Sequence, residues 1–332
     1  MSGLAALTLA GLLGAELVAR YVLQLGDPVL MQTHPTIEYL AQPSQDVMVF
    51  GVRHRINAFG MRSDDPPAIV ESADTPTLRV LVLGDSVING GRRTDHADLS
   101  TTQAQAILAE RTGRPTWVGN LSAGSWGPGN WLAYVSEYGM FNADAAVIVL
   151  APHDISDTPT FNADFAASLP TRRPRSAAVV AFTEAWSRYA PAVLRADGNK
   201  PDPSDLSQPG PAVRAADDPA RIAGERDIAT LLQRLSDAGV PTAMLYFPEA
   251  DTDERHAGIE QRYRDLCDEA DARFVDLSDV FLTDDPKTNP AYQDRMHPSA
   301  HGRDLLADEL AEAVLGLIAD RQSKGVPLAT AP

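Results

Sequence analysis

From residue 78 onward, short apolar runs alternate with longer stretches in which apolar residues recur at a helical period. Apolar runs bounded by turn residues predict strands, and the amphipathic stretches predict helices. Strands that alternate with helices are typical of a parallel sheet covered on both faces, which predicts a three-layer α/β/α sandwich. The expected strands are 78–83, 116–119, 145–150, 242–247 and 273–276, and the expected helices are 99–111, 129–138, 219–238, 253–272 and 302–318.

Residues 1–25 form an apolar stretch that is interrupted only by Glu16 and Arg20. These two residues are four apart, so they can pair on one face of a helix. Arg20 lies near the end of the stretch, where a long basic side chain can reach the membrane surface. No basic region precedes the stretch, and no small-residue cleavage pattern follows it. We therefore expect an uncleaved membrane anchor, with a cleaved signal peptide or a packed amphipathic helix as alternatives.

The composition is that of a globular protein with an acidic surface. The chain has 332 residues, of which 44% are hydrophobic and 22% charged, enough for one large α/β domain with additions. The net charge of −17 argues against nucleic acid or anionic lipid as a partner. The single cysteine, Cys267, excludes an internal disulfide, and we expect it to be a buried, inert thiol.

Two short motifs carry the candidate chemistry. A Gly-Asp-Ser tripeptide at 84–86 directly follows the first expected strand, and an Asp-x-x-His motif at 294–297 precedes the last expected helix. Each motif is common by itself. In open α/β sheets, however, ligands bind at the carboxyl ends of the strands, so both motifs are expected at one edge. A serine, an imidazole and a carboxylate are the groups that nucleophilic acyl transfer requires.

Together these motifs resemble the first and last sequence blocks of the SGNH (GDSL) hydrolase family, over roughly residues 78–318. The resemblance implies a flavodoxin-like sandwich with a central parallel sheet, and no metal or cofactor. It also implies that Ser86 is the nucleophile, that His297 is the general base and then the acid, and that Asp294 orients His297. The segment 55–62 resembles one that often precedes the first block in membrane-anchored members from bacterial envelopes.

The middle blocks of the family supply the groups that hold the oxyanion. In the resemblance, the N–H of Ser86 and that of a glycine contribute, and Gly124 is the first choice for the glycine, with Gly127 as the alternative. The third block usually reads Gly-x-Asn-Asp, whereas this chain has His153 in the asparagine position. A histidine can donate through a ring N–H, so we expect His153 to be an oxyanion donor. The alternative is a polar loop residue with no catalytic part.

Three further residues are candidates for contact with substrate. Asp154 follows His153, and Glu249 follows the fourth expected strand. Trp186 lies in a proline-rich segment, 155–218, which we expect to be an insertion that partly covers the catalytic edge, with a mobile loop as the alternative. A metal site is not expected, because His297 and His301 lack a third ligand.

The expected organisation is an anchor over 1–25, an extension over 26–77, a hydrolase domain over 78–320 with the insertion, and a tail over 321–332. We expect the extension to pack on the main domain, with a flexible stalk as the alternative.

The resemblance and the anchor together suggest a single-pass membrane protein whose catalytic domain faces the periplasm or exterior. The first functional hypothesis is an esterase or O-acyltransferase that acts on acyl esters, above all acetyl esters, of carbohydrate or envelope polysaccharide, with polysaccharide biosynthesis proteins as possible partners. The alternatives are a general small-ester or lipolytic hydrolase and a non-catalytic binding subunit of a polysaccharide assembly.

Overall fold

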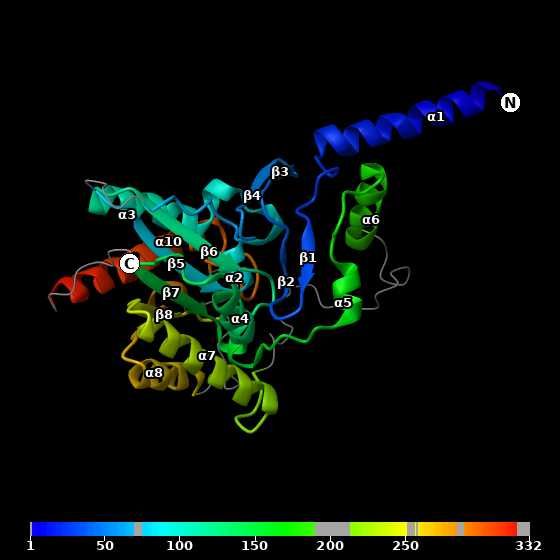
Figure 1. Ribbon diagram of the computed structural model, residues 1–332. Coiled ribbons are helices and arrows are strands. Elements are labelled where there is room, and N and C mark those ends of the chain that lie inside the picture. The colour runs from blue at the N-terminus through cyan, green and yellow to red at the C-terminus, as the bar shows by residue number, and fades with distance from the viewer. Residues whose placement is uncertain are drawn as a thin grey trace.

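A five-stranded parallel sheet forms the centre of the protein (Figure 1). The computed structural model describes residues 2–69, 75–189, 213–250, 256, 258–283 and 289–323. The strand order is β6-β5-β7-β8-β9, which is the order of flavodoxin-like folds and confirms the predicted fold class. The strands are β5 (Leu78–Gly84), β6 (Thr116–Ser122), β7 (Ala145–Leu150), β8 (Thr242–Tyr246) and β9 (Arg273–Asp276).

Strand β5 lies inside the sheet and has a partner strand on each of its edges. All seven of its residues are buried, and it pairs on one edge with β6 and on the other with β7. Val82, for example, lies opposite both Asn120 and Val147. A strand buried on both faces reads as a continuous apolar run, as this one does.

Helices cover both faces of the sheet, as a parallel sheet requires. Alternate residues of the strands point to opposite faces, so the apolar core divides into two clusters. In Figure 1, α3 lies above the sheet, and α7 and α8 lie below it. One face is covered by α3 (Ser100–Thr112) and α10 (Ala300–Ser323), and the other by α4 (Pro128–Tyr138), α7 (Pro219–Asp237) and α8 (Ile259–Glu269).

Several predicted element boundaries differ from the structure, most of them by one or two residues, and α10 runs from Ala300 to Ser323 rather than over 302–318. Strand β6 continues to Ser122 rather than ending at 119, because its polar residues are buried in the sheet and hydrogen-bonded there. Asn120 donates from Nδ2 to the carbonyl of Ile88 at 3.0 Å and to Oγ1 of Thr101 at 3.0 Å. The helix expected over 253–272 is described only as α8, since 251–255 lie outside the described residues, as do the polar run 197–208 and the tail from 324 onward.

The extension before β5 consists of two antiparallel hairpins that the sequence did not predict. They are formed by β1 (Met31–His34) with β2 (Glu38–Ala41) and by β3 (Gln45–Val49) with β4 (Val52–Ile56). The first hairpin is hydrogen-bonded to the main body. Asn130 donates to the carbonyl of Ile37 at 2.7 Å, and the indole of Trp126 donates to the carbonyl of Tyr39 at 3.1 Å.

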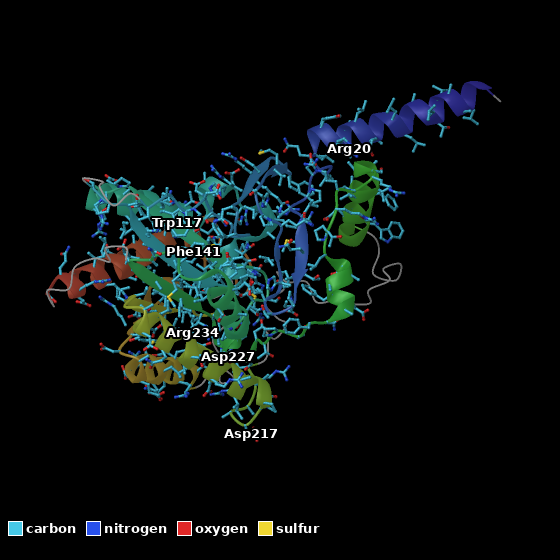
Figure 2. The ribbon with its side chains drawn as sticks, in the orientation of Figure 1. Arg20, Trp117, Phe141, Asp217, Asp227 and Arg234 are labelled. Carbon is cyan, nitrogen blue, oxygen red and sulfur yellow. The ribbon has the colours of Figure 1, made fainter. Side chains whose placement is uncertain are left out.

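The N-terminal helix projects from this body (Figure 1). It comprises α1 (Ser2–Leu17) and a short π-helical turn, η1 (Val18–Val22). The segment Gly3–Val22 is long and apolar enough to cross a membrane, with a mean hydropathy of 1.4. Figure 2 labels Arg20 at the base of this helix, where it meets α6 (Ala177–Tyr189). Helix α6 and the shorter α5 (Ala163–Ser168) belong to the segment that follows β7.

Two helix-interior glycines give a test of this packing. A Cβ on Gly224 in α7 would fall on the carbonyl of Ile155, a backbone group that cannot move away. A Cβ on Gly316 in α10 would meet only the guanidinium of Arg273, the mobile end of a flexible side chain. We expect Gly224→Ala to lower the free energy of unfolding by about 1–3 kcal/mol, the usual cost of overpacking. Gly316→Ala is the matched control and should be neutral or slightly stabilising. Equal urea midpoints for the two variants would contradict the close approach of α7 to the loop after β7.

Candidate active site

Ser86 lies at the carboxyl end of the central strand. It is the first residue of a four-residue helix, α2 (Ser86–Asn89), which starts directly after β5. Asp85 caps this helix, since its Oδ1 accepts from the N–H of Val87 at 2.8 Å. A second hydrogen bond fixes the same turn: the indole N–H of Trp131 donates to the carbonyl of Gly84 at 2.9 Å. The serine is thereby presented at the edge of the sheet on a fixed backbone.

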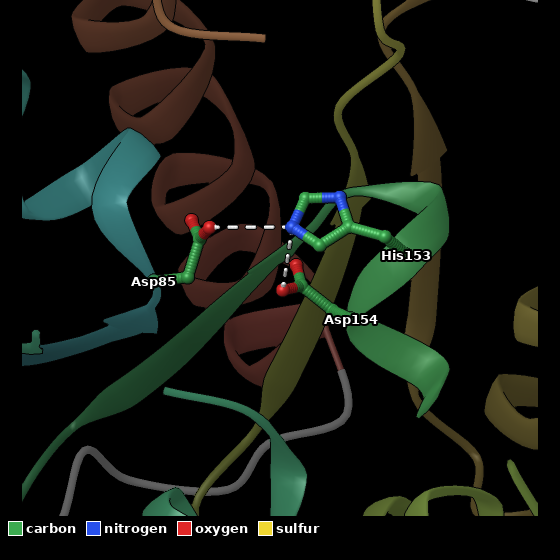
Figure 3. Close-up of side chains that lie close together, drawn as sticks. All are labelled: Asp85, His153 and Asp154. Atoms are coloured by element: carbon green, nitrogen blue, oxygen red, sulfur yellow. Dashed lines mark ion pairs between the residues drawn. The ribbon is translucent and has the colours of Figure 1, made fainter. Parts of the chain in front are cut away.

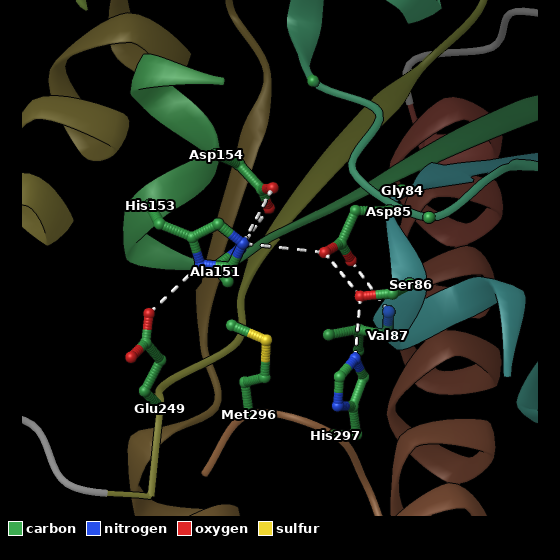
Figure 4. A network of polar contacts seen from close by, with 12 residues as sticks. Gly84, Asp85, Ser86, Val87, Ala151, His153, Asp154, Glu249, Met296 and His297 are labelled. Atoms are coloured by element: carbon green, nitrogen blue, oxygen red, sulfur yellow. Dashed lines mark hydrogen bonds and ion pairs between the residues drawn. The ribbon is translucent and has the colours of Figure 1, made fainter. Parts of the chain in front are cut away.

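The loop before α10 brings a histidine and an aspartate to this serine (Figure 4). Oδ1 of Asp294 accepts from the N–H groups of Met296 at 3.0 Å and His297 at 2.8 Å, which fixes the loop. Nδ1 of His297 lies 2.9 Å from Oδ2 of Asp294, and Nε2 lies 2.9 Å from Oγ of Ser86. If Nδ1 donates to the carboxylate, Nε2 is free to accept the proton of the serine hydroxyl.

The pairing of His297 with Asp294 changes the pKa values of both groups. Burial favours the neutral imidazole, but the hydrogen bond and the negative charge of Asp294 outweigh burial and raise the pKa of His297 above its ordinary value. Burial likewise opposes the charged form of Asp294, but the hydrogen bonds from His297 lower the pKa of this carboxyl. The imidazole is therefore a stronger base than a free histidine.

A second histidine, His153, lies among buried carboxylates close to Ser86 (Figure 3). Nδ1 of His153 is 3.1 Å from Oε1 of Glu249, while Nε2 is 3.7 Å from Oδ2 of Asp85 and 3.6 Å from Oδ1 of Asp154. The side chain of His153 is 10% exposed, and those of Asp154 and Glu249 are fully buried. Oγ of Ser86 also lies 3.1 Å from Oδ2 of Asp85, so the cluster is in direct contact with Ser86.

The charges in this cluster are balanced by protons. Burial opposes the imidazolium, yet the carboxylates of Asp154, Asp85 and Glu249 together raise the pKa of His153 well above its ordinary value. Burial, followed by the charge of Asp85, raises the pKa of Asp154 well above its usual range. The pKa of Asp85 is lowered, because the nearby positive charge of His153 and the hydrogen bond from the N–H of Val87 outweigh burial. We infer a protonated His153 beside an ionised Asp85, with Asp154 carrying its proton.

The same residues are the part of the described chain best placed to hold a metal. One ligand atom each from Asp85, His153 and Asp154 lies within 4.8 Å of the others. Metal ligation requires a neutral imidazole and an ionised carboxylate. The raised pKa values of His153 and Asp154 favour the opposite protonation states, so protons compete strongly with any ion at this position.

Two backbone amides at this edge are free to donate. Within the described residues, neither the N–H of Ser86 nor that of Gly124 has a hydrogen-bond acceptor. Gly124 follows β6, the neighbour of β5, and its carbonyl accepts from the hydroxyl of Tyr39 in the first hairpin. Gly127 is a poorer donor, because its buried N–H is already bonded to Oδ1 of Asn130 at 3.0 Å.

The structure does not bring all of the candidate substrate contacts to an open surface. Asp154 and Glu249 lie beside His153 but are fully buried, so they are placed to position His153 rather than to bind substrate. Trp186 is 44% exposed on α6, where its ring lies 5.8 Å from that of Phe182, and no contact of it with the Ser86 site is described. The thiol of Cys267 is buried in α8, and burial raises its pKa to about 12.

Arg62 supports the site and was not singled out from the sequence. Its buried guanidinium donates to the carbonyls of Asn89, Gly91 and Thr94, in the segment that follows α2. Burial lowers the pKa of Arg62 to about 10. Only its place in the segment 55–62, which resembles a segment of anchored family members, gave any sign of this role.

A cavity of about 510 Å³ adjoins this edge of the sheet. It is bounded by the hairpins, by the loop after β6 and by the inner side of α6. Its lining is largely apolar, with arginines at several points. Residues that represent its walls are Leu25, Val49, Trp126 and Val180, together with Asn89, Ser122 and Gly124 from the catalytic edge and the basic residues Arg62, Arg92 and Arg172.

Solved structures with a similar chain path are distant in sequence. An acetylxylan esterase from Geobacillus stearothermophilus, solved as a catalytic mutant, is 13% identical and has a TM-score of 0.43, covering 71% of this chain and 93% of that one. A psychrotrophic esterase from Pseudoalteromonas is 12% identical with a TM-score of 0.42, covering 73% and 99%. A GDSL-like lipase from Bacteroides thetaiotaomicron is 10% identical with a TM-score of 0.39, covering 72% and 88%. No curated protein matches the chain.

The match to a family model is more direct. The model of the SGNH domain that is fused to AT3 domains matches residues 142–312, just over half of the chain. This region contains His153, Asp154 and the Asp294 to His297 loop, and it begins after the Gly-Asp-Ser turn. The chain therefore belongs to the SGNH family, as an SGNH-type serine enzyme of the ester hydrolase or acyltransferase class.

Proposed function

We propose that this protein cleaves or transfers acyl groups, chiefly acetyl groups, on carbohydrate or envelope polysaccharide through an acyl-enzyme on Ser86. The observation that carries the proposal is the continuous hydrogen-bond chain from Ser86 through His297 to Asp294. It aligns a nucleophile, a base of raised pKa and an orienting carboxylate at the carboxyl edge of a parallel sheet.

In the first step, Oγ of Ser86 bonds to the carbonyl carbon of the ester while its proton passes to Nε2 of His297. The oxyanion is held by the N–H groups of Ser86 and Gly124 and by Nε2–H of His153. The tetrahedral intermediate collapses as His297 gives its proton to the departing alkoxide, which leaves as the alcohol. Asp294 stabilises the imidazolium throughout.

In the second step, water or a sugar hydroxyl attacks the acyl-enzyme and gives its proton to His297. The proton then returns to Oγ of Ser86 as the serine leaves. Water as the acceptor releases a carboxylic acid, and a sugar hydroxyl gives a new ester. The two outcomes use the same protein groups.

The N-terminal helix supports a place at the membrane surface. The segment Gly3–Val22 is long and apolar enough to span a bilayer, and we propose that it anchors the catalytic body on the periplasmic or outer side. Polymer acylation at this surface requires partner proteins that make or export the polysaccharide. The family model describes SGNH domains fused to AT3 domains, which agrees with a role alongside a second protein domain.

One observation favours a second candidate, a lipolytic hydrolase. The cavity beside the catalytic edge is lined largely by apolar side chains, which suit an acyl chain better than a saccharide. Turnover that increases with acyl-chain length, together with no release of acetate from acetylated polysaccharide, would favour this function. The intact hydrogen-bond chain argues against a subunit that only binds polysaccharide.

We expect a fluorophosphonate probe to label Ser86 covalently and Ser86→Ala to abolish both labelling and ester turnover, because Ser86 is the hydroxyl that the described residues place in hydrogen-bond contact with His297. Labelling is read by intact-protein mass spectrometry, and turnover by the release of acetate from acetylated polysaccharide and of phenolate from an aryl acetate. Ser136→Ala, a change of the same kind on the exposed side of α4, is the matched control. Undiminished turnover in Ser86→Ala would overturn the proposed function.

The raised pKa of His297 predicts the pH dependence. His297 must be neutral to accept the serine proton, so kcat/KM should rise with pH through an inflection above 6.5, the unperturbed value. Asp294→Asn removes the charge that raises this pKa, so the inflection should move to lower pH and the rate should fall by up to about 10⁴-fold. Asp308→Asn removes an exposed charge on α10 and should change neither value. An inflection that stays in place in Asp294→Asn would contradict the pairing.

His153 can be tested for its two roles separately. His153→Ala removes an oxyanion donor, so kcat should fall by about 10²- to 10³-fold. The same change leaves buried carboxylates without their cation, so the urea midpoint should also fall. His153→Asn supplies an N–H at similar reach without the charge, so it should recover much of kcat but not the urea midpoint. A kcat for His153→Ala equal to that of the parent would restrict His153 to a structural role.

A further inference from the structure

Helix α6 has an apolar face that is exposed among the described residues of the protein. Val179, Phe182 and Trp186 are 61%, 63% and 44% exposed, and their spacing of three and four residues places them on one face of the helix. The rings of Phe182 and Trp186 lie 5.8 Å apart and form a continuous apolar surface. Single exposed apolar residues are common, but a contiguous set of this kind marks a surface that contacts a partner.

The opposite face of α6 is packed against the protein. Ala177 is buried in a small cluster with Ala19, Leu25 and Val49, and Val180 packs against the same cluster. Val180 also lines the cavity beside the catalytic edge. The side of α6 that faces the protein is therefore already packed, and Val179, Phe182 and Trp186 lie on a different side of the helix.

The start of α6 is fixed to the base of the N-terminal helix. The carboxylate of Glu16 accepts from Oγ of Ser176 at 2.7 Å and from the N–H groups of Ala177 at 3.1 Å and Ala178 at 3.0 Å. Arg20 donates to the same carboxylate at 2.7 and 2.9 Å. Figure 2 shows Arg20 at this junction. The orientation of α6 relative to α1 is thus set by a helix cap and an ion pair rather than by a loose linker.

The direction of α6 suits a helix that lies on a bilayer. Figure 1 shows α6 running crosswise to α1, beginning near the carboxyl end of α1 and on the side of the body toward which α1 projects. A helix that crosses a spanning helix in this way runs along the membrane surface. We propose that α6 is an interfacial helix, with Val179, Phe182 and Trp186 inserted at the boundary between headgroups and acyl chains of the bilayer that α1 enters.

The chemistry of the surface fits this partner. Tryptophan and phenylalanine are favoured at membrane interfaces, and amphipathic interfacial helices bury their apolar face by about 5–10 Å. The turn that precedes α6 carries three exposed arginines, Arg172, Arg173 and Arg175, in a chain whose net charge is −17. Their long side chains can reach lipid phosphate groups while the helix lies below them. The inference rests on the proposed anchoring by α1.

Trp186 gives a direct probe of this contact. It is the exposed member of the four tryptophans, since Trp117, Trp126 and Trp131 are 3% exposed or less. Full-length protein is placed in nanodiscs of phosphatidylcholine whose acyl chains carry bromine, which quenches indole fluorescence on contact. We expect a loss of emission in brominated discs relative to unbrominated discs, and no such loss in Trp186→Phe. The aryl acetate assay on the same samples reports ester hydrolysis independently.

Each result of this experiment either supports or overturns the proposal that α6 contacts the bilayer. Quenching that disappears in Trp186→Phe supports membrane contact by α6, whether or not the sample hydrolyses esters. The test of membrane contact is therefore independent of the test of the proposed function. Full incorporation without quenching overturns membrane contact by α6, and so does quenching that persists in Trp186→Phe. Failure of the protein to enter nanodiscs overturns both proposals, the membrane contact of α6 and the anchoring by α1. If Trp186 is instead shielded from acrylamide in detergent only at concentrations where the protein dimerises, the face is covered by a second copy.

Discussion

The site depends on one constraint, the burial of β5 with partners on both of its edges. All seven residues of this strand are buried, and its end is tied to α4 by the bond from Trp131 to Gly84. Because the strands are parallel, the loops after β5, β6, β7 and β8 leave the sheet at one edge. Each of them supplies a group to the site. The loop before α10 holds His297 against Ser86 through its own internal bonds and through the bond from the N–H of Ala250, after β8, to the carbonyl of Arg295 at 2.8 Å.

Asp85 joins the nucleophile to the buried charge cluster. One of its oxygens caps α2, and the other lies between Ser86 and His153. A change in the protonation of His153 would therefore reach the serine through a single carboxylate. Buried charges are stable only when they are paired with opposite charges. Here the pKa values of His153 and Asp154 are raised, so both groups hold protons that offset the negative charge of the cluster.

The sequence predicted the sheet because its strands read as apolar runs, and it predicted the Ser86, His297 and Asp294 set because two motifs were tied to strand ends. It could not predict the hairpins, whose strands of four or five residues carry little periodicity. The extent of β6 was missed because Asn120 reads as a loop residue until its partners are known. The surroundings of His153 come from three separate loops, and the support given by Arg62 comes from a contact across 27 residues or more, so neither has a local signal.

Ser86 and His297 are 211 residues apart in the chain. During synthesis, Ser86 leaves the ribosome long before His297 is added to the chain. Ser86 and His297 cannot come together until the loop before α10 has been made and has folded against the sheet. A chain that stops before His297 therefore carries an unactivated hydroxyl at Ser86. Such a chain is chemically harmless to the cell's own esters before the protein is fully made and in place.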